Sequence, residues 1–207
     1  MVNEKKIIGL TGVSCAGKNH VALLLEQRSL PVLDADKLGH QVIEMEREHI
    51  LARFGGDILT GDGLIDRKLL SAKVFGKPRE LAALEEIIHP RVNREALVWI
   101  NSRPEKVCVI NAALLHRSSV FESMDAIIIV EAPFIVRLLR ARKRDKQPWS
   151  IILKRFRSQS KFSTQYSTGK TDIYRVENSG YFGFVTRFLR NKLENRIDEI
   201  LSLLGIT

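Results

Sequence analysis

Short apolar runs alternate along this chain with longer segments whose hydrophobic residues recur at helical spacing. Four runs have the length and composition of buried strands: Ile7–Thr11, Pro31–Asp34, Val107–Asn111 and Ala126–Glu131. Each precedes a segment of helical pattern: 18–28, about 37–53, about 117–124 and about 134–145. Strands that alternate with helices predict an α/β fold, in which a parallel sheet lies between helical layers in one domain over residues 1–207.

Three further segments interrupt or extend this pattern. Residues 54–104 are mostly helical and predict a helical insertion beside the sheet, in which Pro90 should kink or break a long helix. Residues 146–170 are first basic and then polar, which is typical of a helix followed by a loop. From Phe182 onward the apolar residues return to helical spacing and predict a closing helix.

The composition is that of a globular protein, with 44% hydrophobic and 28% charged residues and a mean hydropathy of -0.07. No apolar run approaches the ~18 residues of a membrane span, and the N-terminus lacks the apolar stretch of a signal peptide. We therefore expect a cytoplasmic protein without a membrane partner. Two cysteines make neither a disulfide framework nor a metal cluster, and Cys108, in an apolar run, is expected in the core.

The net charge of +9 is concentrated in one segment. Ten Lys and Arg residues lie within 137–161, with Asp145 as the only acid, and the rest of the chain carries no net charge. Such a segment suits either a nucleic-acid surface or a lid over an anionic small molecule. Because only Trp149 and Phe156 interleave with the basic residues, base stacking has little support. We predict a lid over residues 137–170 and no nucleic-acid partner.

A phosphate-binding pattern lies between the first strand and the first helix: Gly12, four residues, Gly17, Lys18, and then Asn19 where Ser or Thr is usual. Backbone N–H groups at a helix N-terminus bind phosphate oxygens, and Lys18 adds a positive charge. Asn19 stands in the place of the hydroxyl that holds Mg²⁺, which an amide oxygen can also ligate. Cys15, in the same loop, is either a passive residue or a thiolate favoured by the neighbouring charges.

Two carboxylates, Asp34 and Asp36, follow the second strand. The carboxyl ends of parallel strands share an edge, so these side chains are expected on the same edge as the phosphate loop. We predict that Asp36 is a general base and that Asp34 is a metal ligand. The structural alternative is that Asp36 caps the next helix and Asp34 belongs to a turn.

Further motifs lie in and beyond the insertion. Asp62-Gly63 predicts a tight turn, and Asp66 a cap for a helix that starts at Arg67. With the preceding motifs, the order of the following segments resembles the dephospho-coenzyme A kinase family: Gly9–Gly12, Gly17-Lys18, Asp34–Asp36, Asp62–Arg67, Ile88–Pro90, Leu114-Leu115, Arg144-Asp145 and Asn178 with Gly180.

The resemblance implies transfer of the γ-phosphate of ATP, with Mg²⁺, to the ribose 3′-hydroxyl of dephospho-coenzyme A, the last step of coenzyme A synthesis. The implied catalytic residues are Asp36 as base, Lys18 and Arg140. The implied nucleotide-binding residues are Gly12, Cys15, Ala16, Gly17, Lys18, Asn19, His20, Arg144 and Asn178. The implied substrate-binding residues are Asp36, Asp66, Arg67, His89 and Leu115, with the insertion holding the substrate and the basic segment closing as a lid.

Departures from the family pattern cluster near the γ-phosphate. Asn19 replaces Ser or Thr, Asn111 replaces an Asp at the end of the third strand, and Arg137 replaces a helix Gln. Two alternatives therefore remain open, a kinase of another nucleoside or small alcohol, and a weakened nucleotide- or RNA-binding regulator. The sequence leaves the oligomeric state open.

Overall fold

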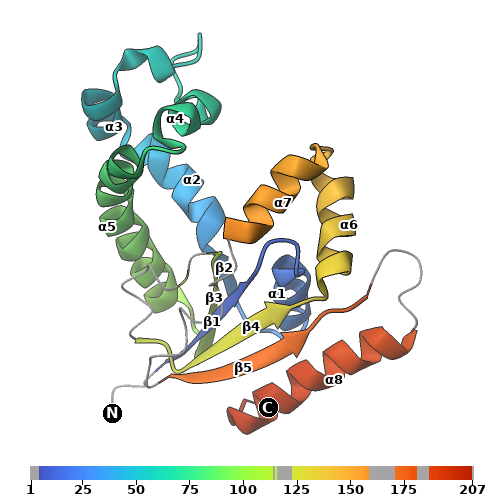
Figure 1. Cartoon of the computed structure of the whole chain (residues 1–207). Coiled ribbons are helices and arrows are strands. Elements are labelled where there is room, and N and C mark those ends of the chain that lie inside the picture. The colour runs from blue at the N-terminus through green and yellow to red at the C-terminus, as the bar shows by residue number, and fades with distance from the viewer. Residues whose placement is uncertain (1–4, 114, 116–122, 159–170, 181–186, 207) are drawn as a thin grey trace. The chain divides into compact units, whose positions relative to one another are not determined.

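The computed structural model describes residues 5–113, 115, 123–158, 171–180 and 187–206 (Figure 1). The chain folds into two compact units, Met1–Leu33 with Arg103–Thr207, and Asp34–Ser102. The predicted helix at about 117–124 lies almost wholly outside the described residues, as does the predicted loop up to residue 170. No helix in the described part of the chain has the length and hydrophobicity that crossing a bilayer requires.

The first unit is built on a five-stranded sheet in the order β2-β3-β1-β4-β5 (Figure 1). The strands are β1 (Lys6–Gly12), β2 (Val32–Asp34), β3 (Val107–Asn111), β4 (Ala126–Glu131) and β5 (Asp172–Glu177). β1 pairs in parallel with β3 and β4, and β4 pairs in parallel with β5. The predicted α/β class is confirmed, and the parallel pairing brings the carboxyl ends of these strands to one edge.

Helices cover this sheet because the strands present apolar side chains to them. The helices of the unit are α1 (Lys18–Glu26), α6 (Phe134–Asp145), α7 (Trp149–Ser158) and α8 (Arg187–Leu203). Alternate residues of a strand face opposite sides, and Ile8 and Leu10 of β1 pack in one cluster with Val21 of α1 and Ile197 of α8. Cys108 is fully buried, as predicted.

The second unit is helical. It contains α2 (Ala35–Met45), α3 (Arg47–Phe54), the 3₁₀ turn η1 (Gly56–Ile58), α4 (Arg67–Val74) and α5 (Pro78–Ser102), whose apolar faces share a core around Ile50, Ile58 and Leu70. The single helix predicted over about 37–53 is therefore wrong, since two helices meet at Glu46. α5 continues through Pro90, so a break at that residue is also wrong; proline removes one N–H donor, and the flanking turns keep theirs.

Side-chain caps fix where two helices of this unit begin. Asp34 is the N-cap of α2, and its Oδ1 accepts a hydrogen bond from the Lys37 N–H at 3.0 Å. The structural alternative from sequence assigned this cap to Asp36, which instead lies in the first helical turn. Asp66 caps α4 as predicted, accepting from the Lys68 N–H at 2.7 Å, and Gly63 provides the positive φ of the turn before it.

Candidate active site

Glycines shape both ends of the phosphate loop. Gly12 ends β1, and a Cβ there would lie 2.5 Å from the Val130 carbonyl oxygen of β4. Gly17 has a φ of 98°, and a Cβ on it would overlap the Asn178 amide nitrogen. Cys15 also has a positive φ, 62°, which is uncommon for a residue with a side chain. The loop is thus held in one tight path, after which the Gly17 carbonyl accepts from the His20 N–H at 2.9 Å as α1 begins.

Two arginines of α6 hold the loop from outside. They are three residues apart and so lie on one face of the helix. Arg137 Nε donates to the Ser14 carbonyl at 3.0 Å, and Arg140 Nη1 donates to the Cys15 and Ala16 carbonyls at 3.2 and 2.8 Å. These bonds turn the carbonyl groups of the loop toward α6, and they fix the backbone of the loop before any ligand binds.

Asn178 is the third support of the loop. It follows β5, is 7% exposed, and its backbone N–H donates to the Glu131 carbonyl at 2.8 Å. Its side-chain Nδ2 donates to the Ala16 carbonyl at 3.0 Å, and its Oδ1 accepts from Arg140 Nη2 at 3.2 Å. Asn178, predicted as a nucleotide residue, is therefore brought to the loop by the strand β5.

The loop carries positive charge that the described residues do not neutralise. No carboxylate in the described part of the chain forms an ion pair with Arg137 or Arg140, and burial lowers the pKa of both guanidinium groups. The pKa of His20 is also lowered, first by burial and then by the charges of Arg140 and Arg190. Burying cations without anionic partners is costly, so the site favours an anion such as phosphate.

An amide pair lies at the carboxyl edge of the same strands. Asn19 is in the first turn of α1, and Asn111 ends β3 opposite Leu10 of β1. Asn111 Nδ2 donates to Asn19 Oδ1 at 3.3 Å. Asn111 is 2% exposed, and its Oδ1 has no hydrogen-bond partner among the described residues.

Three further predicted residues of the first unit are Lys18, Arg144 and Leu115. Lys18 is the first residue of α1 and is half-buried. Arg144 pairs with its neighbour Asp145 at 2.6 Å, and this bond raises the pKa of Arg144. Leu115 is fully buried, and its Cδ2 fills the space where a Cβ of Gly9 would stand, so the side chain has a packing role.

The second unit carries the predicted substrate residues. Asp66 and Arg67 line a cavity of about 870 Å³ together with His40, Lys68 and residues of α4. His89 is half-buried on α5 and does not line this cavity. Asp36 is exposed on α2.

A model of the dephospho-CoA kinase family matches residues 6–180. The chain belongs to the dephospho-CoA kinase family. A dephospho-CoA kinase of Treponema denticola is 31% identical over 94% of this chain and 92% of its own length, and one of Deinococcus radiodurans is 36% identical over 97% and 93%. The crystal structure of TT1252 from Thermus thermophilus superposes with a TM-score of 0.80 at 27% identity, covering 97% of this chain and 98% of that one.

Membership confirms the resemblance seen in the motifs. Dephospho-CoA kinases are ATP-using phosphotransferases with a P-loop, and they phosphorylate dephospho-CoA in the last step of coenzyme A synthesis. A kinase of this family requires a site for the phosphates of its nucleotide.

Two residues at the loop, Arg137 and Asn111, are not predicted as site residues by the sequence. Each stands out there only as a departure from the dephospho-CoA kinase pattern, and the structure places both against the phosphate loop or its first helix. The spacing of Arg137 and Arg140 on one helix is the signal that could have found the first. For Asn111, the signal is a polar residue that ends a buried strand next to β1.

Proposed function

We propose that this chain transfers the γ-phosphate of ATP to the ribose 3′-hydroxyl of dephospho-coenzyme A. The observation that carries the proposal is the pair of partly buried guanidinium groups, Arg137 and Arg140, which brace the phosphate loop without a described carboxylate partner. Together with family membership, this charge supports a site that binds a polyphosphate.

In the proposed reaction the loop positions the triphosphate. Backbone N–H groups at the start of α1 bind the phosphate oxygens, and Lys18 and Arg140 stabilise the charge that spreads over the transferring group. His20, Arg144 and Asn178 complete the proposed nucleotide site. Asp36 accepts the proton of the attacking hydroxyl, which makes that oxygen a better nucleophile.

The side chains at the loop fit a magnesium ion that arrives with the nucleotide. Asn19 and Asn111 supply neutral oxygens, one of them buried and without a described partner. Bound Mg²⁺ would neutralise phosphate charge. The Asp34 carboxylate, predicted as a further ligand, is already occupied in capping α2, and no cluster of three His, Cys, Asp or Glu residues occurs among the described residues.

The cavity of the second unit is the proposed place for the acceptor. Its lining combines the cationic side chains of Arg67 and Lys68 with the exposed ring of Phe75, which suits a molecule with phosphates and a long uncharged arm. Asp66 caps α4 and so fixes the first turn of that helix, in which Arg67 lies.

The decisive experiment measures ADP release from ATP with dephospho-coenzyme A, adenosine and other nucleosides as acceptors. We expect turnover with dephospho-coenzyme A to exceed turnover with the others by at least about 100-fold. The long uncharged arm of dephospho-coenzyme A supplies binding energy, and the nucleosides have no such arm. Equal turnover with adenosine would favour the alternative of a general nucleoside kinase.

A substitution at Asp36 tests the proposed base. Asp36→Asn should lower kcat by about 10²-fold or more while ATP affinity stays within about twofold, since an amide cannot accept the hydroxyl proton. Asp57→Asn removes a carboxylate of the same unit that pairs with Lys73, and it is the matched control, with kcat expected near that of the wild type. Near-normal turnover of Asp36→Asn would leave Asp36 only a first-turn residue of α2.

A further inference from the structure

Two amides occupy the place where P-loop enzymes hold Mg²⁺ with a hydroxyl and a carboxylate. Asn19 follows the loop lysine, and Asn111 ends the strand beside β1. The hydrogen bond between them, 3.3 Å from Asn111 Nδ2 to Asn19 Oδ1, shows that the two positions are in contact. Neither side chain carries a negative charge, so the pair attracts a divalent cation only weakly in the absence of a nucleotide.

The charges on the other side of the loop are cationic. Arg137 lies against the Ser14 carbonyl, with its guanidinium 4.5 Å from the centre of the Phe156 ring. Arg140 lies against the next two carbonyls. The described residues provide neither arginine with a carboxylate partner, so the field at the loop attracts phosphate and repels a metal cation.

The amide pair and the arginines both reduce the part that a divalent cation plays at the loop. The amides lack the negative charge that would hold the cation, and the arginines supply positive charge that the cation would otherwise supply. We infer that this loop neutralises the phosphates of its nucleotide mainly with Lys18 and the two arginines, Arg137 and Arg140, so that ATP binding depends only weakly on a divalent cation. The inference rests on the proposed function, since it concerns how the same site binds ATP.

The experiment measures the dissociation constant of ATP for the full chain by calorimetry, once with Mg²⁺ and once with EDTA. We expect the two constants to differ by less than about tenfold, because the arginines remain when the metal is removed. Tight binding with Mg²⁺ and a loss of about 100-fold or more in EDTA would overturn the inference and leave the proposed function intact. Absence of binding under both conditions would overturn both.

Two variants test the charge at the amide pair. Asn111→Asp puts a carboxylate beside Asn19 and should weaken ATP binding in EDTA by about tenfold or more, with recovery in Mg²⁺. Asn191→Asp makes the same charge change on the exposed surface of α8 and should leave both constants unchanged. Equal effects of Asn111→Asp with and without Mg²⁺ would contradict the inference.

Arg137→Gln tests the arginines, and it remains informative if a buried carboxylate at position 111 prevents folding. It should weaken ATP binding in EDTA by about tenfold and in Mg²⁺ by less, because the cation then replaces the missing guanidinium charge. A larger loss in Mg²⁺ than in EDTA would overturn the inference. Melting temperatures of all variants separate loss of binding from loss of folding.

Discussion

Arginines at two edges of the first unit differ in what neutralises them. At the loop edge, Arg137 and Arg140 donate to carbonyl and amide oxygens, and burial lowers their pKa. At the other end of α1, Arg28 Nε lies 2.5 Å from Asp198 Oδ1, and this hydrogen bond raises the pKa of Arg28. The same residue type thus has opposite pKa shifts in one sheet-centred unit.

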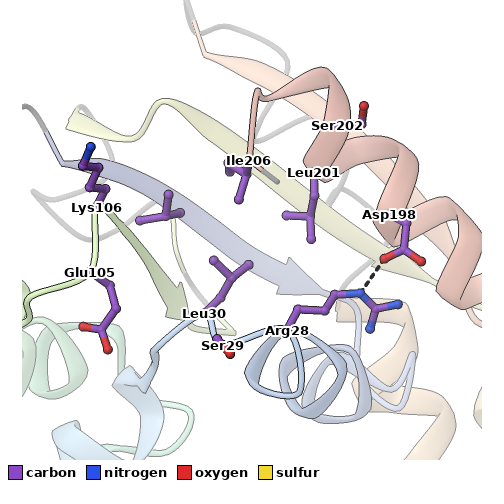
Figure 2. A pocket seen from close by; sticks show the side chains of 10 residues that line it. Arg28, Ser29, Leu30, Glu105, Lys106, Asp198, Leu201, Ser202 and Ile206 are labelled. Atoms are coloured by element: carbon purple, nitrogen blue, oxygen red, sulfur yellow. Dashed lines mark hydrogen bonds and ion pairs between the residues drawn. The ribbon is translucent and has the colours of Figure 1, made fainter.

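The difference separates a structural cation from one that is available to a ligand. Arg28 lines a cavity of about 510 Å³ with Leu30, Lys106 and Leu201, where the dashed line in Figure 2 marks its pair with Asp198. That pair joins the end of α1 to α8 and leaves little unbalanced charge for an anion. Arg140 has no comparable carboxylate in the described residues, so its charge is not cancelled and acts on a phosphate through the loop that its N–H groups hold.

The largest expected effect comes from removing the available cation. Arg140→Gln should weaken ATP binding by about 10- to 100-fold, since it removes the positive charge behind the loop together with charge-assisted bonds, worth about 1.5–3 kcal/mol each, that hold the loop carbonyls. Arg28→Gln is the matched control and should leave ATP affinity unchanged, because its partner is internal. Calorimetry on both variants makes the comparison, and equal losses would show that the neutralised arginine also serves the nucleotide.

A smaller effect is expected on stability from Arg28→Gln. The exposed pair should contribute less than about 1 kcal/mol to the free energy of unfolding at neutral pH. The Arg28 hydrogen bond lowers the pKa of Asp198 from 3.8, so this contribution is present above that value and is lost as the pH falls through the lower folded-state pKa. Urea unfolding at several pH values measures it, and a difference between wild type and variant that grows on acidification would contradict the assignment.

The smallest effect concerns His20, beside the loop cations. Its folded-state pKa lies below 6.5, chiefly through burial, so folding favours the neutral imidazole. The wild type should therefore keep its full stability above about pH 6.5 and lose some as the pH falls below it, because the unfolded chain binds the proton more readily. His20→Gln should lack this loss, which melting temperatures at pH 7.5 and 5.5 can show. Identical pH dependence in both proteins would mean that the pKa of His20 is not lowered in the folded protein.

Much of the fold could be predicted because the central strands are almost wholly apolar. Val107–Asn111 and Ala126–Glu131 have the bounds that the hydrophobic pattern predicts, and the following helix Phe134–Asp145 does as well. The pattern does not predict β5, because Asp172–Glu177 is an edge strand with Val176 as its one buried residue and charged residues at both ends. A strand exposed at the sheet edge lacks the continuous apolar run by which a central strand is found.

The site was harder to predict than the fold, because its supports come from far along the chain. The loop motif gives Gly12, Gly17 and Lys18 directly, whereas the contact of Asn111 with Asn19 depends on which strands become neighbours. Asp34 and Asp36 show the same limit on a smaller scale, since the structural alternative from sequence had Asp36 as the cap of α2 and the structure has Asp34 there. The backbone at Asp34 is extended and places its side chain to accept the capping bond.

The bond from Asn178 to the Ala16 carbonyl has a consequence for the order in which the chain is made. The two residues are 162 positions apart, and Arg140 lies between them in sequence while bonding to both. A nascent chain therefore contains the whole phosphate motif long before it contains the groups that hold that motif in shape. A nascent chain should therefore bind ATP only after β5 and Asn178 have left the ribosome. By then β1, which leads into the phosphate loop, has long been made, so ATP does not assist its early folding.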